Sequence, residues 1–281
     1  MNSKDKLKKH SRIRLFIQFV FAVLINGYLT GYAKGTIFTG KTKIACVPVL
    51  NCYSCPGALG SCPIGAMQAV IGGYKHQISL YVLGLVMLFG LVLGRLICGL
   101  LCPFGLFQDL MHKIPVPKFK IPKKIDSKMR YLKYIIALVM VILLPMFLTN
   151  KFGIASPYFC KLICPAGTLG GALPLLYKNE LLRNTIGALF NWKMGVLIVI
   201  TLSAMFINRP FCKYLCPLGA FYSFFNKFSF YQLKLDENKC TGCKACEKVC
   251  PMDVEVVKNI NSAECIKCGR CKSICPTGAI K

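Results

Sequence analysis

Long apolar runs alternate with short basic segments over the first 230 residues of the chain. A membrane-spanning helix needs roughly 20 mainly apolar residues, and four runs approach that length: 13–32, 78–97, 132–148 and 192–207. We therefore expect four transmembrane helices. The third run contains Pro145, and we expect a kink there because proline has no N–H to donate within a helix. A further semi-apolar stretch, 166–177, is rich in glycine and proline, and we interpret it as an interfacial or re-entrant segment.

Composition supports a membrane protein. Hydrophobic residues make up 55% of the 281 positions and charged residues only 16%, whereas soluble domains carry about 25% charged residues. Lysine and arginine number 36 against ten acids, for a net charge of +26. These basic residues flank the apolar runs, which is where membrane topology signals lie. We therefore expect contact with a lipid bilayer and no nucleic-acid binding.

The distribution of basic residues predicts an orientation. The N-terminal segment 4–14 and the loop 113–130 are the most basic connections between the apolar runs. The positive-inside rule then places the N-terminus, this loop and the C-terminal segment in the cytoplasm. We predict a multi-pass protein of a prokaryotic cell membrane. The N-terminus lacks a clear signal-peptide cleavage site.

The most specific chemical signal lies in the last fifty residues. Two runs, 240–251 and 265–276, have the spacing C-x2-C-x2-C-x3-C-P. Bacterial two-cluster ferredoxins have this pattern, in which the fourth cysteine of each run ligates the other cluster. Zinc also binds C-x2-C pairs, but two complete runs that end in proline favour iron. We predict two [4Fe–4S] clusters, one held by Cys240, Cys243, Cys246 and Cys275, and the other by Cys250, Cys265, Cys268 and Cys271.

Shorter cysteine pairs with the spacing C-x3-C-P precede this domain. At the expected inner ends of the second and fourth spans they provide one set of four thiols, Cys98, Cys102, Cys212 and Cys216. The expected outer loops offer six candidates for four positions, namely Cys46, Cys52, Cys55, Cys62, Cys160 and Cys164. We favour a set of four that contains Cys62, Cys160 and Cys164, together with either Cys52 or Cys55. These sets predict one or two further iron–sulfur clusters, with redox-active disulfides and inert buried thiols as the alternatives.

The order of span, outer cysteines, span and inner cysteines occurs twice. We interpret residues 13–112 and 132–228 as two repeated halves. The expected fold is a polytopic α-helical membrane domain, 1–230, followed by an α+β two-cluster ferredoxin domain, 231–281. Carboxylates within the apolar runs are nearly absent, so ion pumping by this chain is not expected. No residue stands out as a nucleophile or acid–base catalyst, which indicates a component of an oxidoreductase rather than a complete enzyme.

Two features leave alternatives open. Gln68 and Gln108 follow equivalent cysteines in C-P-x-G-x-x-Q, where they either hydrogen-bond cluster sulfurs or cap a turn. Residues 231–281 carry nine basic residues against six acids. That excess suits either an acidic soluble electron carrier or anionic lipid headgroups.

With its four spans, its C-x3-C-P pairs and its C-terminal cysteine runs, the chain resembles the NapH type of membrane polyferredoxin, related to the membrane part of NosR-type proteins. The resemblance implies an electron conduit that serves a redox partner outside the membrane, with quinol or flavoprotein components. The donor is then a ferredoxin, a flavodoxin or quinol, and the acceptor an extracytoplasmic redox subunit such as a flavoprotein. The outer cysteines depart from the simplest pattern of that family. Two other functions remain open, a thiol–disulfide conduit and a redox-sensing or cofactor-maturation protein.

Overall fold

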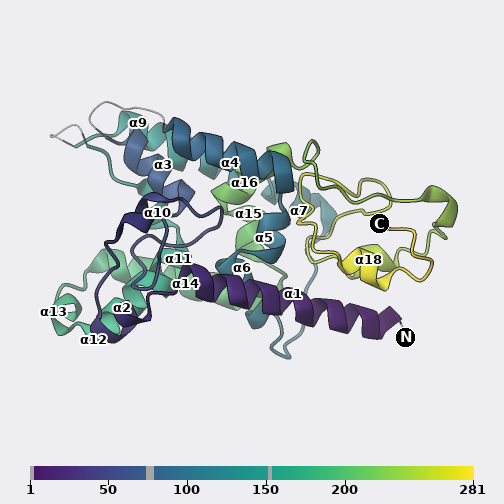
Figure 1. Cartoon of the computed structure of the whole chain (residues 1–281), viewed down its shortest axis with the longest axis horizontal. Coiled ribbons are helices and arrows are strands. Elements are labelled where there is room, and N and C mark those ends of the chain that lie inside the picture. The colour runs from purple at the N-terminus through teal and green to yellow at the C-terminus, as the bar shows by residue number, and fades with distance from the viewer. Residues whose placement is uncertain (1–2, 74–78, 151–153) are drawn as a thin grey trace.

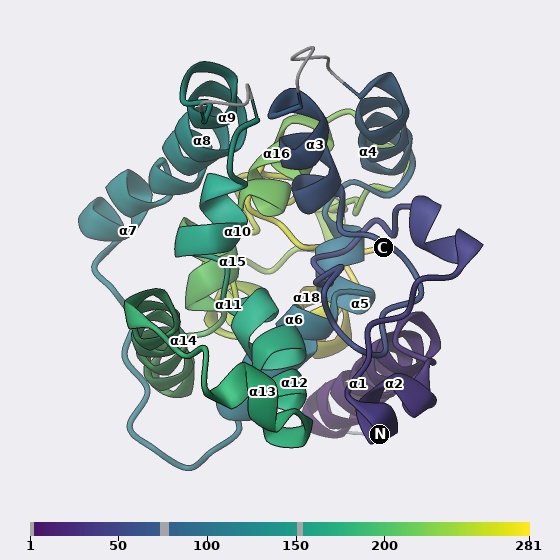
Figure 2. The same ribbon diagram turned by 90° about the vertical axis from the view of Figure 1, so that its left-hand side faces the viewer.

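Long helices surround a centre of shorter helices that carry the cysteines (Figures 1 and 2). The computed structural model describes residues 3–73, 79–150 and 154–281. The outer helices are α1 (Ser3–Ile25), α4 (Leu80–Leu93), the continuous helix formed by α7 (Lys123–Met129), α8 (Leu132–Ile136), η2 (Ala137–Leu143) and α9 (Leu144–Phe147), and α14 (Ala188–Phe206). The inner helices are α3 (Pro63–Ile71), α5 (Leu96–Leu100), α6 (Pro103–Met111), α10 (Tyr158–Leu162), α11 (Pro165–Gly167), α15 (Pro210–Tyr214) and α16 (Pro217–Phe225).

The remaining elements are short. At the end away from the C-terminal domain they are α2 (Leu29–Lys34), η1 (Lys41–Ile44), η3 (Thr168–Ala172), α12 (Leu173–Lys178) and α13 (Glu180–Arg183). The C-terminal domain contains η4 (Glu237–Lys239), α17 (Ala245–Lys248) and α18 (Arg270–Ile274).

The outer helices turn apolar side chains outward and polar ones inward. On α1, Phe16 and Leu24 are 67% and 64% exposed, whereas Arg14 and Gln18 are buried. Large apolar side chains are likewise exposed on α4 and α14. Apolar surface of this extent is unusual for a soluble monomer, and polar groups that face the interior are typical of membrane helices. The surface of the helical bundle is therefore suited to lipid.

Two of the four expected spans form helices that are long enough to cross a membrane. Within the described residues these are Lys123–Phe147, with 25 residues, and Ala188–Phe206, with 19. The first expected span divides between α1 and α2 instead of forming one helix. In the second, α4 has only 14 residues and ends at Leu93, because the following residue, Gly94, has a φ of 59° that breaks the helix. Ile78, the expected start of that span, lies outside the described residues.

Both internal prolines of these apolar segments follow a π-helical stretch. The π-helical residues 137–143 precede Pro145, and η3 precedes Pro174 in the same way. Such local adjustments let a membrane helix accommodate a residue that lacks a backbone N–H. The helix expected to kink at Pro145 thus continues to Phe147. The segment interpreted as interfacial is helical from Pro165 to Lys178.

The C-terminal domain consists mainly of loops and projects from one end of the helical bundle (Figure 1). The expected α+β fold is not seen in the described residues, because an isolated antiparallel bridge between Leu235 and Ile280 replaces a sheet. Backbone hydrogen bonds between Lys234 and Lys281 flank that bridge. Because the two cysteine runs occupy most of the domain as loops, only its terminal segments remain to pair.

Buried ion pairs fix this domain against the helices. Glu264 accepts hydrogen bonds from Arg95 at 2.9 Å and from Lys133 at 2.5 Å. Lys213 pairs with Asp253 at 2.8 Å. Helix α1 also packs along α18. Charges in the interior are tolerated only when they are paired, so these contacts specify one docked position.

Candidate iron–sulfur sites

The three C-x3-C-P motifs fold into the same turn. In each, the first cysteine lies on a short helix and the second caps the next helix. The backbone N–H of the second cysteine donates to the residue before the first one, from Cys102 to Ile97 at 3.1 Å, and the two other turns share this bond at 2.9 Å. The motif therefore encodes a fixed spacing between two thiols.

A proline after the second cysteine begins the following helix and directs its N-terminus at the sulfur. Proline is favoured at the first helical position because the missing N–H has no partner there. The N–H of Gly219 lies 3.4 Å from the Cys216 sulfur, and Gly65, Gly105 and Gly167 donate in the same way to Cys62, Cys102 and Cys164. The positive end of a helix stabilises a thiolate, so these positions suit metal-ligating cysteines.

The inner set of cysteines converges on one buried site. Cys98 and Cys102 lie on α5 and at the start of α6, and Cys212 and Cys216 on α15 and at the start of α16; all four are buried. Burial raises the pKa of Cys216, and thiolate charge on the three others raises that pKa further. Four neighbouring thiols cannot all ionise without a cation, and the iron of a cluster supplies the compensating charge. The residues thus fit a cluster.

A buried arginine network holds the inner turns. Arg209 donates to both oxygens of Asp109, at 2.9 and 2.7 Å, and to the carbonyl of Cys98 at 2.6 Å. Arg14 from α1 joins the same carboxylate at 2.7 Å. Burial raises the pKa of Asp109, but the two arginines outweigh it and lower the pKa to about 2. Sequence reasoning missed this network, although a charge beside an apolar run is itself a signal of function.

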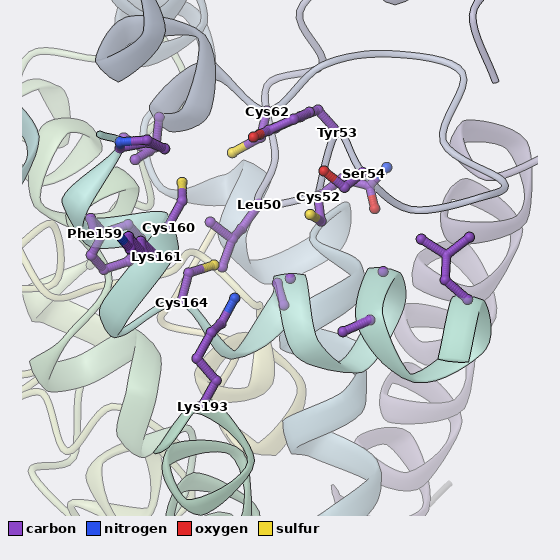
Figure 3. A pocket seen from close by; sticks show the side chains of 18 of the residues that line it. Leu50, Cys52, Tyr53, Ser54, Cys62, Phe159, Cys160, Lys161, Cys164 and Lys193 are labelled. Atoms are coloured by element: carbon purple, nitrogen blue, oxygen red, sulfur yellow. The ribbon is translucent and has the colours of Figure 1, made fainter. Parts of the chain in front are cut away.

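The outer set surrounds a cavity of about 380 Å³ at the other end of the bundle. Cys52, Cys62, Cys160 and Cys164 line it. Figure 3 shows their sulfur atoms turned toward one space, which Lys193 reaches from α14. Of the two cysteines left open by the sequence, Cys52 lines this cavity and Cys55 does not; the Cys55 sulfur lies 2.9 Å from the Tyr32 hydroxyl.

Cys46 belongs to a different part of the outer loop. It pairs with Ser61 through an isolated parallel bridge and is absent from the lining of the outer cavity. All eighteen cysteines lie within the described residues, and none of them forms a disulfide.

Two glutamines occupy equivalent positions at the two sites. Gln68 donates to the Cys160 sulfur at 3.3 Å and accepts from the Phe159 N–H at 3.0 Å. Gln108 donates to the Cys212 sulfur at 3.1 Å and accepts from the N–H of the preceding phenylalanine at 3.1 Å. The structure shows both roles considered for these side chains: each amide N–H donates to a cysteine sulfur, and each amide oxygen accepts a backbone N–H in the first turn of the helix that carries this cysteine. Each of the two sites therefore has a thiol in the same kind of turn, with a glutamine amide that donates a hydrogen bond to it.

The C-terminal runs exchange their fourth cysteines. A small cavity is lined by Cys240, Cys243, Cys246 and Cys275, which come from both runs. Cys250 of the first run lies among the first three cysteines of the second, since thiolate charge on Cys268 and Cys265 adds to the effect of burial and raises the pKa of Cys250 to about 12. The same three thiols, Cys268, Cys265 and Cys250, act on Cys271. The structure thus brings together the two ligand sets expected from the spacing.

The ferredoxin domain and the inner site meet at a glycine. A Cβ atom on Gly99 would lie 2.3 Å from the carbonyl oxygen of Ile266. Gly99 stands between Cys98 and Cys102, and Ile266 between Cys265 and Cys268. Only a residue without a side chain permits this approach. Two cysteine loops from separate domains are therefore in backbone contact.

Among residues 3–73, 79–150 and 154–281, no group of three or more His, Cys, Asp or Glu side chains is arranged to hold a single metal ion. Cysteine thiolates bind a [4Fe–4S] cluster through its separate iron atoms.

Paired cysteine turns inside a helical bundle, together with a domain of exchanged cysteine runs, define an iron–sulfur protein of the ferredoxin type. A family described as 4Fe-4S binding domain matches residues 75–122 and 189–235, and a 4Fe-4S dicluster domain matches residues 232–276. An uncharacterized protein of Methanocaldococcus jannaschii is 30% identical over 72% of the chain and 69% of its own length. The chain belongs to the same family of iron–sulfur electron-transfer proteins.

Two more distant relatives carry informative names. The methylamine utilization ferredoxin-type protein MauN of Paracoccus denitrificans is 26% identical over 69% of the chain and 62% of MauN. The regulatory protein NosR of Stutzerimonas stutzeri is 24% identical over 57% of the chain, which spans only 20% of NosR. The expected relation to NosR-type proteins is confirmed, whereas the NapH type remains a prediction. No solved structure matches the chain.

Proposed function

We propose that the chain carries electrons across the membrane, from a cytoplasmic donor to an extracytoplasmic redox partner, through four [4Fe–4S] clusters. The helices and loops that bear the four thiol sets follow one another along the long axis of the molecule (Figure 1). Bound clusters supply one-electron transfer, and the chain sets distance, orientation and surroundings. From the cytoplasmic donor to the extracytoplasmic partner, electrons pass the four thiol sets in this order: Cys240, Cys243, Cys246 and Cys275; then Cys250, Cys265, Cys268 and Cys271; then Cys98, Cys102, Cys212 and Cys216; and last Cys52, Cys62, Cys160 and Cys164.

Repetition of the inner arrangement at the outer site carries this proposal. The cysteines of the inner site lie within the segments that match the 4Fe-4S binding domain, and those of the outer site lie outside them. Both sites nevertheless have helix N-termini directed at sulfur and a glutamine donating to a thiol. Because the outer site shares this local geometry with the inner site, we infer that it also binds a cluster. The Gly99 contact supports transfer between the ferredoxin domain and the inner site.

The membrane topology is part of the proposal. Apolar side chains cover α1 and α4 as well as the two longer helices, which supports four helices in lipid, arranged as the repeats 13–112 and 132–228. The 4Fe-4S binding domain matches once near the end of each half. Basic residues in 4–14 and 113–130 favour a cytoplasmic ferredoxin domain.

The two membrane sites differ in how well they are covered. Lys213, next to Cys212, is buried beneath the ferredoxin domain, whereas Lys161, next to Cys160, is exposed. Cys52 and Cys160 are half-buried, unlike the four inner thiols. An outer site within reach of the surface suits delivery of electrons to a second subunit, for which a flavoprotein is a candidate. The donor is an acidic soluble carrier or quinol.

Iron and acid-labile sulfide per chain, measured on anaerobically purified protein, test the proposal. Four clusters require about 16 iron atoms, and the ferredoxin domain alone about 8. EPR of the reduced protein then distinguishes the clusters. A value near 8, with membrane cysteines that can be alkylated after reduction without loss of iron, would instead support a thiol–disulfide conduit or a redox sensor.

Matched cysteine variants assign the iron to sites. Cys62→Ser with Cys164→Ser is expected to remove only the outer cluster and leave about 12 iron atoms. Cys55→Ser is the control, because this neighbouring cysteine faces Tyr32 and lies outside the cavity lining; we expect it to retain all the iron. Equal iron loss in both variants would contradict the assignment of Cys52.

A further inference from the structure

A segment of the expected outer loop runs through the interior of the bundle. Residues 48–51 are all buried, and Val49 and Leu50 are only 0% and 3% exposed. These residues belong to no helix or strand. Irregular segments normally lie at the surface, because their backbone polar groups need hydrogen-bond partners. The segment 48–51 finds its partners in the interior, at the two membrane sites.

Leu50 contacts both of these sites. Its backbone N–H donates to the sulfur of Cys102, which belongs to the inner set. Its side chain lines the cavity that the outer thiols surround (Figure 3). Cys52, two residues further along the chain, lines the same cavity. One hydrogen bond and two peptide bonds therefore lead from an inner thiol to a residue of the outer set.

Tyr222 holds the beginning of this segment. The tyrosine lies on α16, and its side chain is fully buried. Its hydroxyl donates to the carbonyl of Pro48 at 2.9 Å. Thiolate charge on three cysteines of the inner set and on Cys62 of the outer set acts on this hydroxyl. Tyr222 is therefore within reach of both thiol sets.

We propose that the segment 48–52 is the bridge for electrons between the inner and outer sites, and that Tyr222 is the positioning residue that holds this bridge. The inference rests on the proposed function and deepens it. One electron leaves the inner cluster and reduces the outer one, and no bond is formed or broken on the way. Because electrons pass more readily through bonded and hydrogen-bonded atoms than across a gap, displacement of Leu50 would slow this step.

Tyr222→Phe tests the positioning role, since it removes the hydroxyl and keeps the ring. Tyr158→Phe is the matched control, because the Tyr158 hydroxyl also donates to a backbone carbonyl, that of Leu148 at 3.2 Å, outside the segment. Hydrogen exchange measured by mass spectrometry reports on the segment itself. We expect faster exchange over residues 49–52 in Tyr222→Phe alone, since only this variant releases the Pro48 carbonyl.

Electron flow is measured in proteoliposomes that enclose ferricyanide, with dithionite added outside. Vesicles are captured through an affinity tag on the N-terminus, which lies on the side of the ferredoxin domain (Figure 1). A misplacement of about 1 Å can slow a position-dependent reaction about a hundredfold, and we expect Tyr222→Phe to lower the flux about tenfold. EPR at steady state should then show the inner cluster more reduced and the outer cluster more oxidised than in the unaltered protein. Redox titration of the same samples corrects for changes in potential.

An amide-to-ester change at Leu50 tests the bridge without altering any side chain. Incorporation of the corresponding hydroxy acid removes only the N–H that reaches Cys102, and we expect the same pattern of a reduced inner and an oxidised outer cluster. The same change at Val47 is the control, because the Val47 N–H donates to the Ser61 carbonyl at 3.0 Å and not to a thiol. Its steady state should match that of the unaltered protein.

The outcomes separate the bridge from the proposed function. Unchanged flux in Tyr222→Phe and in the Leu50 ester, or equal effects in variants and controls, would overturn the bridge. A lower unfolding temperature of Tyr222→Phe with unchanged flux would likewise assign the tyrosine to packing alone. Total iron is measured on the same samples. About 12 iron atoms in the unaltered protein would contradict the proposed function, whereas about 16 with unchanged flux would contradict the bridge alone.

Discussion

Gln108 donates to the Cys212 sulfur at 3.1 Å while its amide oxygen accepts the Phe211 N–H at 3.1 Å. The second bond determines which end of the amide faces the sulfur. Because the side chain is buried, water is not available to replace either partner. Gln68 repeats this arrangement at Cys160.

Replacing Gln108 with leucine removes a donor to a ligand sulfur of the inner site. Hydrogen bonds to cluster sulfurs stabilise the reduced state, whose negative charge is greater. We expect Gln108→Leu to lower the inner potential by tens of millivolts, since a hydrogen bond of about 1 kcal/mol corresponds to about 40 mV for one electron. EPR-monitored redox titration measures the shift. Gln68→Leu should shift only the outer potential, and an unchanged inner potential in Gln108→Leu would sink this role.

Gly99→Ala places a methyl group against the Ile266 carbonyl. The 2.3 Å approach forces the two cysteine loops apart, and overpacking of this kind costs about 1–3 kcal/mol. We expect a lower unfolding temperature and slower electron transfer from the ferredoxin domain to the inner site. Gly84→Ala is the control, because no atom lies within 4 Å of its Cβ position. Equal behaviour of the two variants would show that the contact has no role.

Glu264→Gln leaves Arg95 and Lys133 without their carboxylate. Breaking a buried ion pair in this way costs about 3–5 kcal/mol, and we expect faster hydrogen exchange in α18 and around Ile266. Glu255→Gln is a matched control, because its pair with Lys123 is exposed and such pairs contribute about 0–1 kcal/mol. Similar exchange in both variants would contradict docking through Glu264.

The docking of the ferredoxin domain against the helices should weaken at acidic pH. Burial raises the pKa of Glu264, but Arg95 and Lys133 outweigh it and hold the pKa below its ordinary value of 4.5. A depressed carboxylate pKa contributes stability that is complete above 4.5 and lost as pH falls through the lower, folded-state value. Hydrogen exchange of α18 should therefore be constant in the neutral range, after correction for intrinsic rates, and increase only below about pH 4.5. An increase already near neutral pH would contradict this assignment.

Arg209→Lys retains charge but not geometry. Lysine cannot reproduce three directed bonds to Asp109 and Cys98, because its ammonium is a single point of charge. We expect loss of about 2–3 kcal/mol of stability and of inner-site iron. Arg183→Lys, at an exposed arginine that donates to two carbonyls, should retain both. Iron analysis with thermal unfolding checks the pair.

The spacing of cysteines along the chain predicted which thiols lie together, but it did not predict the side chains that surround them. The grouping of Cys250 and Cys275 follows from a spacing pattern in which the fourth cysteine of each run joins the other set, and the structure places both cysteines beside those sets. The choice of Cys52 over Cys55 depends on how a long loop crosses Tyr32, which no local pattern records. The broken first span has the same origin, since the turn at Asn26 depends on a tertiary contact with Asn51. Arg95 pairs with Glu264, and Arg209 pairs with Asp109. The partners are more than 90 positions apart in the sequence, so hydrophobic periodicity could not predict these ion pairs.

The exchanged cysteines have a consequence for biogenesis. Every proposed site draws its thiols from two segments, with Cys62 and Cys164 at the outer site separated by about a third of the chain. No cluster can be completed during synthesis until its later segment has emerged and met the earlier one. Each completed cluster then closes a loop and acts as a cross-link. Iron shortage should therefore yield chains that are inserted but loosely assembled, and iron delivery would be the last step of maturation.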